Sequence, residues 1–474
     1  MWYNVYNRFH VQGGIMINKI SLLLLICSVL LSGCKSQEML DPANPVTISL
    51  WHNYGGQMKN TMDELIAEFN DTVGKEKGII INVTSISGSA TVQEKLLMAA
   101  NEEPNAPELP NITTLYPNTA LILAQKGLLA DIGLQFKNEE LSKYVGRFID
   151  EGRLYDGKLY VFPTAKSTEV IFLNMTAFNR FMKDTDVSYD DLKTFEGIIR
   201  TSEKYYNWTD NQTPEIKNDG KTFIVYDSLF NTAQIGYEQL GENFIINEEL
   251  NLSSPVFEEI WDIFYEPAVK GYVANYNGYG SDLVKTGNVV ASIGSTAGVL
   301  FYSPTITYED NITESVEYFI LPYPTFEDSK KIAVQRGGGM SIIKSDEKEE
   351  YAAGVFLKWF TEPEKNLKFV SSTGYLPVTN EAFDRVMNDS GIIKDDKIRK
   401  LINTVREMQA QYDFYIPPTF DKFEEIQRKY ENKMKESALL SRNEYLKLIE
   451  NTDMDTAYET VSKTILESFI NNMR

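Results

Sequence analysis

The chain has 474 residues, more than one ordinary hydrophobic core holds, so two lobes are expected. Apolar residues make up 43% of the chain and aromatic residues 12%, which is typical of a folded globular protein and excludes a disordered one. The formal net charge of −21 argues against nucleic-acid binding, because phosphate binding needs clustered Lys and Arg.

The N-terminus predicts an exported protein. Residues 20–31 form an apolar run that is too short to span a bilayer and is typical of a signal-peptide core, with Lys19 before it. The run closes on Leu-Ser-Gly-Cys, which resembles the bacterial lipobox and implies a lipid anchor at Cys34. Because Met16 begins a conventional signal peptide, we predict that translation starts there and that the signal covers residues 1–34.

Loss of this segment removes several kinds of chemistry from consideration. After cleavage before Cys34 the chain has no cysteine other than the anchor, so a disulfide or a Cys-based metal site is not expected. One histidine, His52, remains, which excludes a two-His zinc motif. We expect no cofactor and no metal. Residues 35–45 are polar with two prolines and are interpreted as a tether.

Strands and helices alternate in the first third of the folded chain. This order predicts a parallel α/β layer, and open sheets of that type bind ligands beyond the carboxyl ends of their strands. The strand-end loops contain Trp51, His52, Ser89 and Tyr116 as candidate contacts. The expected strands are 46–50, 79–83 and 111–116, and the expected helices are 57–73, 90–103 and 117–125.

The remainder of the chain is predicted to be mixed, then helical. A polar loop is expected at 208–221, and a strand at 333–343 interrupted by three glycines. From residue 381 the pattern is almost wholly helical apart from 412–419. Further helices are expected at 188–206, 223–237, 254–270, 280–286, 350–360 and 364–371, and further strands at 289–293 and 316–322.

The stretch 155–174 stands out because two extended apolar runs flank a polar centre, 164–169. One interpretation is that the chain leaves one lobe, crosses an exposed seam and enters a second lobe. The other is an edge hairpin with a solvated kink, and these residues alone do not decide between the two.

Several motifs together resemble the family-1 extracellular solute-binding proteins of ABC importers, most closely the glycerol-3-phosphate-binding branch. The resemblance implies a two-lobed, periplasmic-binding-protein-like α/β fold (type II) with three interlobe crossovers, near 165–167, 335–337 and 378–381, and a helical C-terminal region. Its implied boundaries are 46–165 and 337–380 for one lobe, and 166–336 and 381–474 for the other. The motifs, in chain order, are the lipobox, Trp51-His52, DGKLYVFPTAKSTEVIFLN, GSTAG, QRGGGMSI, FLKWFTEPEKNLKF and TGYLPV.

The resemblance also implies solute contacts, each with a structural alternative. Ser167 and Thr168 would donate hydroxyls, or serve in a turn; Gly338 would offer its backbone, or act within a hinge. Trp51 would stack on a sugar or polyol, or pack in the core beside a surface His52. The remaining implied contacts are Ser295, Thr296 and Tyr375.

Two departures from the glycerol-phosphate branch affect the expected solute. The stretch 91–93 lacks the acidic residue of that branch, and its late Arg falls one residue out of register, at Gln427-Arg428. Arg336 offers either a phosphate contact or a surface ion pair. A neutral sugar or polyol is therefore as good a candidate as glycerol phosphate.

The function expected is a lipid-anchored, extracytoplasmic, monomeric binding protein that captures a small solute by hinge closure and delivers it to ABC permease subunits. Membrane contact would be through the lipid alone. Two alternatives remain: a two-carboxylate glycoside hydrolase, for which the many acidic residues give no specific signal, and a sensory binding module.

Overall fold

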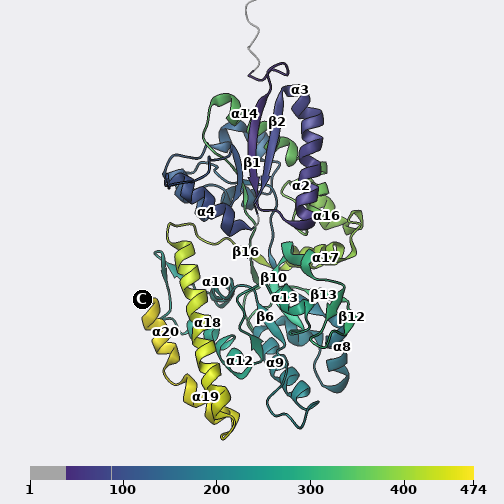
Figure 1. Ribbon diagram of the computed structural model, residues 1–474, viewed down its shortest axis with the longest axis vertical. Coiled ribbons are helices and arrows are strands. Elements are labelled where there is room, and N and C mark those ends of the chain that lie inside the picture. Colours follow the sequence, from purple (N-terminus) through teal and green to yellow (C-terminus); the bar gives the residue numbers. More distant parts are fainter. Residues whose placement is uncertain (1–38, 87) are drawn as a thin grey trace, which may run out of the picture.

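The computed structural model describes residues 39–86 and 88–474, and the chain forms two lobes that lie one above the other (Figure 1). The expected start at Met16, the signal peptide and the lipobox with Cys34 lie outside the described residues. Within the described residues, no helix has both the length and the apolar character needed to cross a bilayer.

The first lobe is built on a five-stranded sheet in the order β2-β1-β3-β15-β4. Strands β1, β2 and β3 are parallel, and β15 runs antiparallel between β3 and β4. Helices α2 and α14 pack on one face, where Phe69 meets Phe356 at 5.2 Å between ring centroids. The bounds are β1 Val46–His52, α2 Gly56–Phe69, β2 Ile79–Ser85, α4 Ser89–Ala100, β3 Ile112–Leu115, α5 Pro117–Gln125, β4 Phe162–Pro163, β15 Gly339–Ile342, α14 Glu347–Phe360 and α15 Pro363–Val370.

Side chains of β1 alternate between two separate hydrophobic cores, as the period of two in a strand requires. Ile48 and Leu50 belong to the core beneath α2 and α14. Trp51 points to the opposite face and packs with Val92 of α4 and Leu121 of α5. The carboxyl end of β1 therefore places neighbouring residues on different faces.

The second lobe is built on a sheet in the order β13-β5-β10-β6-β9. Strand β5 lies between β13 and β10, and all six of its residues are buried. The bounds are β5 Glu169–Asn174, α8 Met175–Asp184, α9 Phe195–Asp210, β6 Ile224–Tyr226, α10 Leu229–Leu240, α11 Val256–Asp262, α12 Tyr265–Lys270, β9 Val273–Ala274, α13 Gly280–Lys285, β10 Ala291–Ser295, β13 Tyr318–Leu321 and β14 Ile332–Val334.

The C-terminal region is mainly helical and returns to the second lobe, where α18 packs against α12 and α10 (Figure 1). Strand β16 pairs in parallel with β14. The bounds are α16 Asn380–Asn388, α17 Asp396–Gln411, β16 Asp413–Tyr415, α18 Phe423–Leu448, α19 Met454–Ser462 and α20 Ile465–Met473.

Shorter elements complete the lobes. They are a π-helix at Asn70–Gly74, 3₁₀ helices at Ile132–Gln135, Tyr189–Lys193, Thr296–Phe301 and Ser390–Ile392, the short helices α3 Lys75–Lys77, α6 Asn138–Leu141 and α7 Gly146–Glu151, and two hairpins, β7 Ile245–Ile246 with β8 Glu249–Leu250 and β11 Thr305–Thr307 with β12 Thr313–Ser315.

The stretch 155–174 connects the lobes, since it leaves the first sheet at β4 and enters the second at β5. The expected seam is therefore present, but the prediction that it is exposed is wrong: residues 164–169 are all buried. Two other segments cover it. Lys166 N donates to Leu376 O at 3.2 Å, and Arg336 N donates to Ser167 O at 2.8 Å.

Local capping corrects the helix expected at 188–206. Ser188 and Asp191 form a capping box on the turn at Tyr189–Lys193. Thr194 then accepts a hydrogen bond from Gly197 N at 3.1 Å and begins α9 as a separate helix. Helix α9 continues to Asp210, so the loop expected from 208 begins later than predicted, and Trp208 packs on Phe181 at 5.4 Å.

Two further helices were predicted too long. The segment 223–237 contains β6 before Ser228 caps α10 by accepting from Asn231 N at 3.1 Å. The segment 254–270 divides into α11 and α12, and Pro267 lies in the first turn of α12, where its missing N–H removes no helical bond. The strand expected before the seam is reduced to Phe162–Pro163.

Candidate functional site

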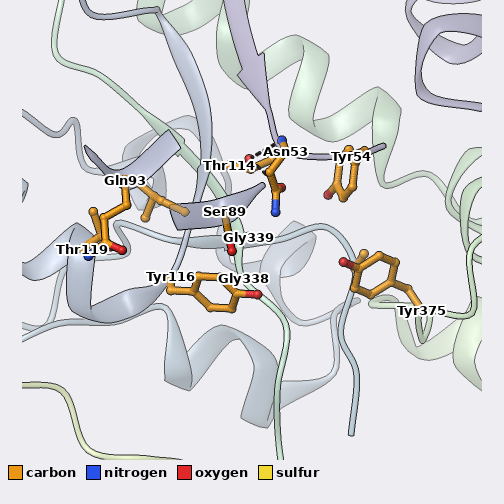
Figure 2. Close-up of a pocket in the computed structure, with 12 residues that line it drawn as sticks. Asn53, Tyr54, Ser89, Gln93, Thr114, Tyr116, Thr119, Gly338, Gly339 and Tyr375 are labelled. Atoms are coloured by element: carbon orange, nitrogen blue, oxygen red, sulfur yellow. Dashed lines mark hydrogen bonds between the residues drawn. The ribbon is translucent and has the colours of Figure 1, made fainter. Parts of the chain in front are cut away.

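A pocket opens at the carboxyl ends of β1 and β3, beside the segments that connect the lobes (Figure 2). This is the position that the α/β topology predicts. Every residue that lines it is uncharged: Asn53, Tyr54, Ser89, Gln93, Thr114, Leu115, Tyr116, Thr119, Ala165, Gly338, Gly339 and Tyr375.

Three tyrosines supply the aromatic surface of this pocket. Tyr54 and Tyr375 meet edge to face at 6.2 Å, and Phe369 of α15 contacts both rings, at 5.0 Å and 6.3 Å. Tyr116 is different, because 41% of it remains exposed. Figure 2 shows the three hydroxyl ends directed toward the same space. Rigid rings around a polar space suit a ligand with a flat apolar face and several hydroxyl groups.

Asn53 provides an oriented amide. Its Oδ1 accepts from the Thr114 hydroxyl at 3.0 Å, and its backbone N–H donates to the same hydroxyl at 3.2 Å. These bonds fix the side chain so that the amide nitrogen points into the pocket (Figure 2). Ser89 is the first residue of α4 and lines the pocket from that helix end.

Glycine is required where β15 approaches β3. A Cβ on Gly338 would lie 2.4 Å from the carbonyl oxygen of Leu115, which no side chain tolerates. The preceding Gly337 has φ +92°, a conformation that favours glycine, and its carbonyl accepts from Lys166 Nζ. The glycine run thus serves close packing at the pocket floor.

Of the ten ligand contacts expected from the sequence, the structure brings four together in this pocket: Ser89, Tyr116, Gly338 and Tyr375. Ser167, Thr168 and Thr296 lie at the junction of the lobes instead. Their hydrogen bonds are internal: Thr168 Oγ1 donates to Val334 O at 2.7 Å, and Thr296 N donates to Thr168 O at 2.9 Å.

Ser295 ends β10 and is half-buried; its hydroxyl accepts from Ala297 N at 3.3 Å. It does not line the pocket of the first lobe.

Trp51 and His52 also lie outside the pocket lining. Trp51 is 9% exposed and packs in the hydrophobic cluster beneath α4 and α5. His52 is fully buried rather than on the surface, and its Nδ1 accepts from Tyr54 N at 3.2 Å. Burial lowers the pKa of His52 to about 4, so its ring is neutral at pH 7.

Charged groups beside the pocket are already paired. Arg336 contacts the buried carboxylate of Glu169 at 2.7 Å, and Asn231 donates to the same oxygen at 2.8 Å. Lys166 pairs with Glu151 at 2.6 Å. Asp227, which does not line the pocket, accepts from Gly280 N at 2.7 Å, and burial raises the pKa of this carboxyl to about 6.

Eight of the lining residues were not predicted individually: Asn53, Tyr54, Gln93, Thr114, Leu115, Thr119, Ala165 and Gly339. Most lie in or beside the strand-end loops that the sequence indicates, so these loops are the feature of the sequence from which they could have been predicted. No group of three or more potential metal ligands occurs among residues 39–86 and 88–474.

The comparisons with known proteins agree with this architecture. Residues 64–401 match the family model described as bacterial extracellular solute-binding protein. Because the match covers more than half of the chain, the protein belongs to this family.

The chain is also similar to curated members of this class. It is 22% identical over 366 residues to the sn-glycerol-3-phosphate-binding periplasmic protein of Escherichia coli (strain K12), covering 71% of this chain and 75% of that protein. The corresponding protein of Shigella flexneri serotype 5b matches with the same identity and coverage.

Solved structures show the same fold. A substrate-binding protein from Listeria monocytogenes in complex with cycloalternan aligns with a TM-score of 0.64 at 16% identity, over 90% of this chain and 99% of that one. The glycerophosphocholine complex of UgpB from Mycobacterium tuberculosis gives 0.63 at 16%, with the same coverage. The prediction of a two-lobed α/β fold is thereby confirmed. The family match shows that the chain is a solute-binding protein rather than an enzyme.

Proposed function

We propose that this protein is the membrane-anchored solute-binding component of an ABC importer, and that it captures a sugar, a polyol or a glycerol-phosphate-type solute between its lobes. One observation carries the proposal: three tyrosine rings and a fixed amide converge on a pocket beside the interlobe segments. Related proteins that bind cyclic oligosaccharides or glycerophosphocholine support the solute class.

Within this class, a neutral polyhydroxy solute fits the described pocket better than a phosphate. The pocket lining carries no charge, and Arg336 is committed to Glu169. A phosphate would have to compete for Arg336 or recruit Arg428, which is exposed on α18. Stacking on Tyr116 and hydrogen bonds to Asn53, Ser89, Tyr375 and the backbone of Gly338 would hold a sugar or polyol.

Closure of the lobes is proposed to complete the site. Ser295, half-buried at the end of β10, is our proposed solute contact from the second lobe. Ser167, Thr168 and Thr296 are proposed to act mainly within the pivot, since their polar groups bond to one another or to Val334 and Arg336, beside the connecting segments. We propose that the first lobe consists of residues 46–165 and 337–380, and the second lobe of residues 166–336 and 381–474.

The remaining parts of the proposal concern the partners. Cys34 would carry the lipid that keeps the protein near its permease while both lobes stay in water, and the protein would act as a monomer. A binding module that signals to a membrane receptor would use the same closed state. We prefer import because the chain belongs to the extracellular solute-binding family.

The test is the thermal shift of the Cys34→Ser chain with a panel of monosaccharides, oligosaccharides, polyols, glycerol phosphate and glycerophosphodiesters. Solute at about a hundred times its Kd stabilises the folded state by roughly 2.7 kcal/mol. We expect neutral solutes to raise the Tm and Tyr116→Ala to reduce the shift at the same solute concentration. A shift with phosphorylated solutes alone would overturn the preference for a neutral solute, and no shift with any solute would contradict the proposed function.

A further inference from the structure

The beginning of α18 reaches from the second lobe to the first (Figure 1). The helix is fixed in the second lobe, because Phe423 and Tyr430 contact Phe230 of α10 at 5.5 Å and 5.7 Å between ring centroids. Its first turn and the residues just before it therefore move with the second lobe.

Glu424 in this turn accepts two hydrogen bonds from the first lobe. Gln93 Nε2 of α4 donates to one carboxylate oxygen, and Thr119 Oγ1 of α5 donates to the other at 3.4 Å. A third bond lies beside them: Phe420 N donates to Asn118 Oδ1 at 3.1 Å. All three cross between the lobes outside the segments that connect them.

The donors to Glu424 are also residues of the pocket. Gln93 and Thr119 both line it, Gln93 half-buried and Thr119 fully buried. Within residues 39–86 and 88–474, no Lys, Arg or His lies within ion-pair distance of Glu424, and the hydrogen bonds that its carboxylate accepts come from these neutral donors. Hydrogen bonds to a carboxylate are stronger than those between neutral groups.

We propose that Glu424 is an interlobe latch and a positioning residue: it holds Gln93 and Thr119 in the pocket only while the lobes are together. Separation of the lobes breaks both bonds and returns the carboxylate to water. Glu424 thus biases the solute-free protein toward closure, and a closed population raises the apparent solute affinity. The effect on affinity rests on the proposed function, whereas the effect on closure does not.

The latch is tested first without solute. The full chain with Cys27→Ser and Cys34→Ser carries labels at Glu76→Cys in α3 and Glu459→Cys in α19, two exposed positions at opposite ends of the molecule (Figure 1). Interlobe distance distributions are then compared for Glu424, Glu424→Gln and Glu424→Ala. We expect the closed-to-open ratio to fall about tenfold in the alanine variant, and less in the glutamine variant, which keeps one acceptor.

Glu425→Ala is the matched control, because the neighbouring Glu425 is exposed and has no hydrogen-bond or ion-pair partner among the described residues. Gln93→Ala removes the donor from the other lobe and should lower the same ratio without altering α18. The latch is wrong if Glu424→Ala keeps the distribution of the control, or if Gln93→Ala changes nothing.

Solute titration separates this inference from the proposed function. If Glu424→Ala shifts the distance distribution but the parent chain binds no solute, the latch proposal is supported and the proposed function is contradicted. If the parent chain binds solute but Glu424→Ala leaves the distance distribution unchanged, the proposed function is supported and the latch proposal is contradicted. Where both hold, Glu424→Ala should weaken solute binding by about tenfold while its unfolding midpoint stays near that of Glu425→Ala.

Discussion

Of the two aromatic residues that the sequence suggests as ligand contacts at strand ends, Trp51 and Tyr116, only Tyr116 lines the pocket. Trp51 lies in a hydrophobic core, whereas Tyr116 is 41% exposed at the pocket. We therefore expect Trp51→Ala to lower the free energy of unfolding by about 3–5 kcal/mol. Tyr116→Ala should leave folding intact and weaken solute binding by about 1–3 kcal/mol.

Denaturant unfolding and isothermal titration of both variants measure these two quantities. If Trp51→Ala keeps normal stability but loses solute affinity, Trp51 is a solute contact, as the sequence predicts, and not a core residue.

His52 gives the stability of the protein a pH dependence. Its pKa is about 4 in the folded chain and about 6.5 when unfolded, so between these values the unfolded chain binds more protons. Stability therefore falls as the pH drops from 6.5 toward 4. His52→Asn keeps an acceptor for Tyr54 N and should reduce this slope by up to about 1.4 kcal/mol per pH unit.

Unfolding free energies of the parent and His52→Asn, measured at several pH values, provide the comparison. The two proteins should differ in slope below pH 6.5 and run parallel above it. Identical slopes throughout would show that His52 gains a proton in the folded protein.

At the scale of elements, the segments that connect the lobes contain a buried ion pair. Lys166 and Glu151 have side chains only 4% and 9% exposed. Lys166→Met leaves the carboxylate of Glu151 buried without its cation, which should cost about 3–5 kcal/mol of stability. Adding Glu151→Leu should restore much of this loss, because the double variant buries no charge.

A double-mutant cycle on thermal or denaturant unfolding isolates this interaction. Lys158→Met serves as its control, since the Lys158–Asp156 pair has a lysine side chain that is 52% exposed and should change stability by less than about 1 kcal/mol. If Lys166→Met and Lys158→Met lower stability equally, the buried Lys166–Glu151 pair contributes no more than an exposed pair, and the prediction is wrong.

Elements with a clear period were predictable from the sequence. The expected strands and helices of the first α/β layer correspond to β1, α2, β2, α4, β3 and α5, because each has a long apolar pattern with turn residues between. Strand β6 has only three residues, Ile224–Tyr226, and its pairing with β10 outweighs the helical pattern around it.

The site was predictable as a set of loops but not as a set of side chains. The strand ends indicated the correct edge of the sheet, yet which face Trp51 joins depends on where β1 ends and on the helices that cover it. Glu424 could not be found in this way, because it contacts Gln93 across 331 positions of sequence. Such contacts are set by tertiary packing alone.

At the scale of the whole molecule, the motifs taken in order predicted more than any one of them. The acidic charge excluded nucleic acid, and the family resemblance supplied the two lobes that the comparisons confirm. Burial of the polar stretch 164–169 was not predictable, because two segments more than 160 residues later cover it.

The position of β15 governs the order in which the molecule is completed after synthesis. This strand fills the gap between β3 and β4, but its first residue, Gly339, follows Leu115 by 224 positions. At about 5–20 residues per second, the edge of β3 waits roughly 10–45 s for its partner. Through that interval the unpaired strand is open to association with other chains. We therefore expect the exposed edge of β3 to be the part of the incomplete first lobe that is most open to such association.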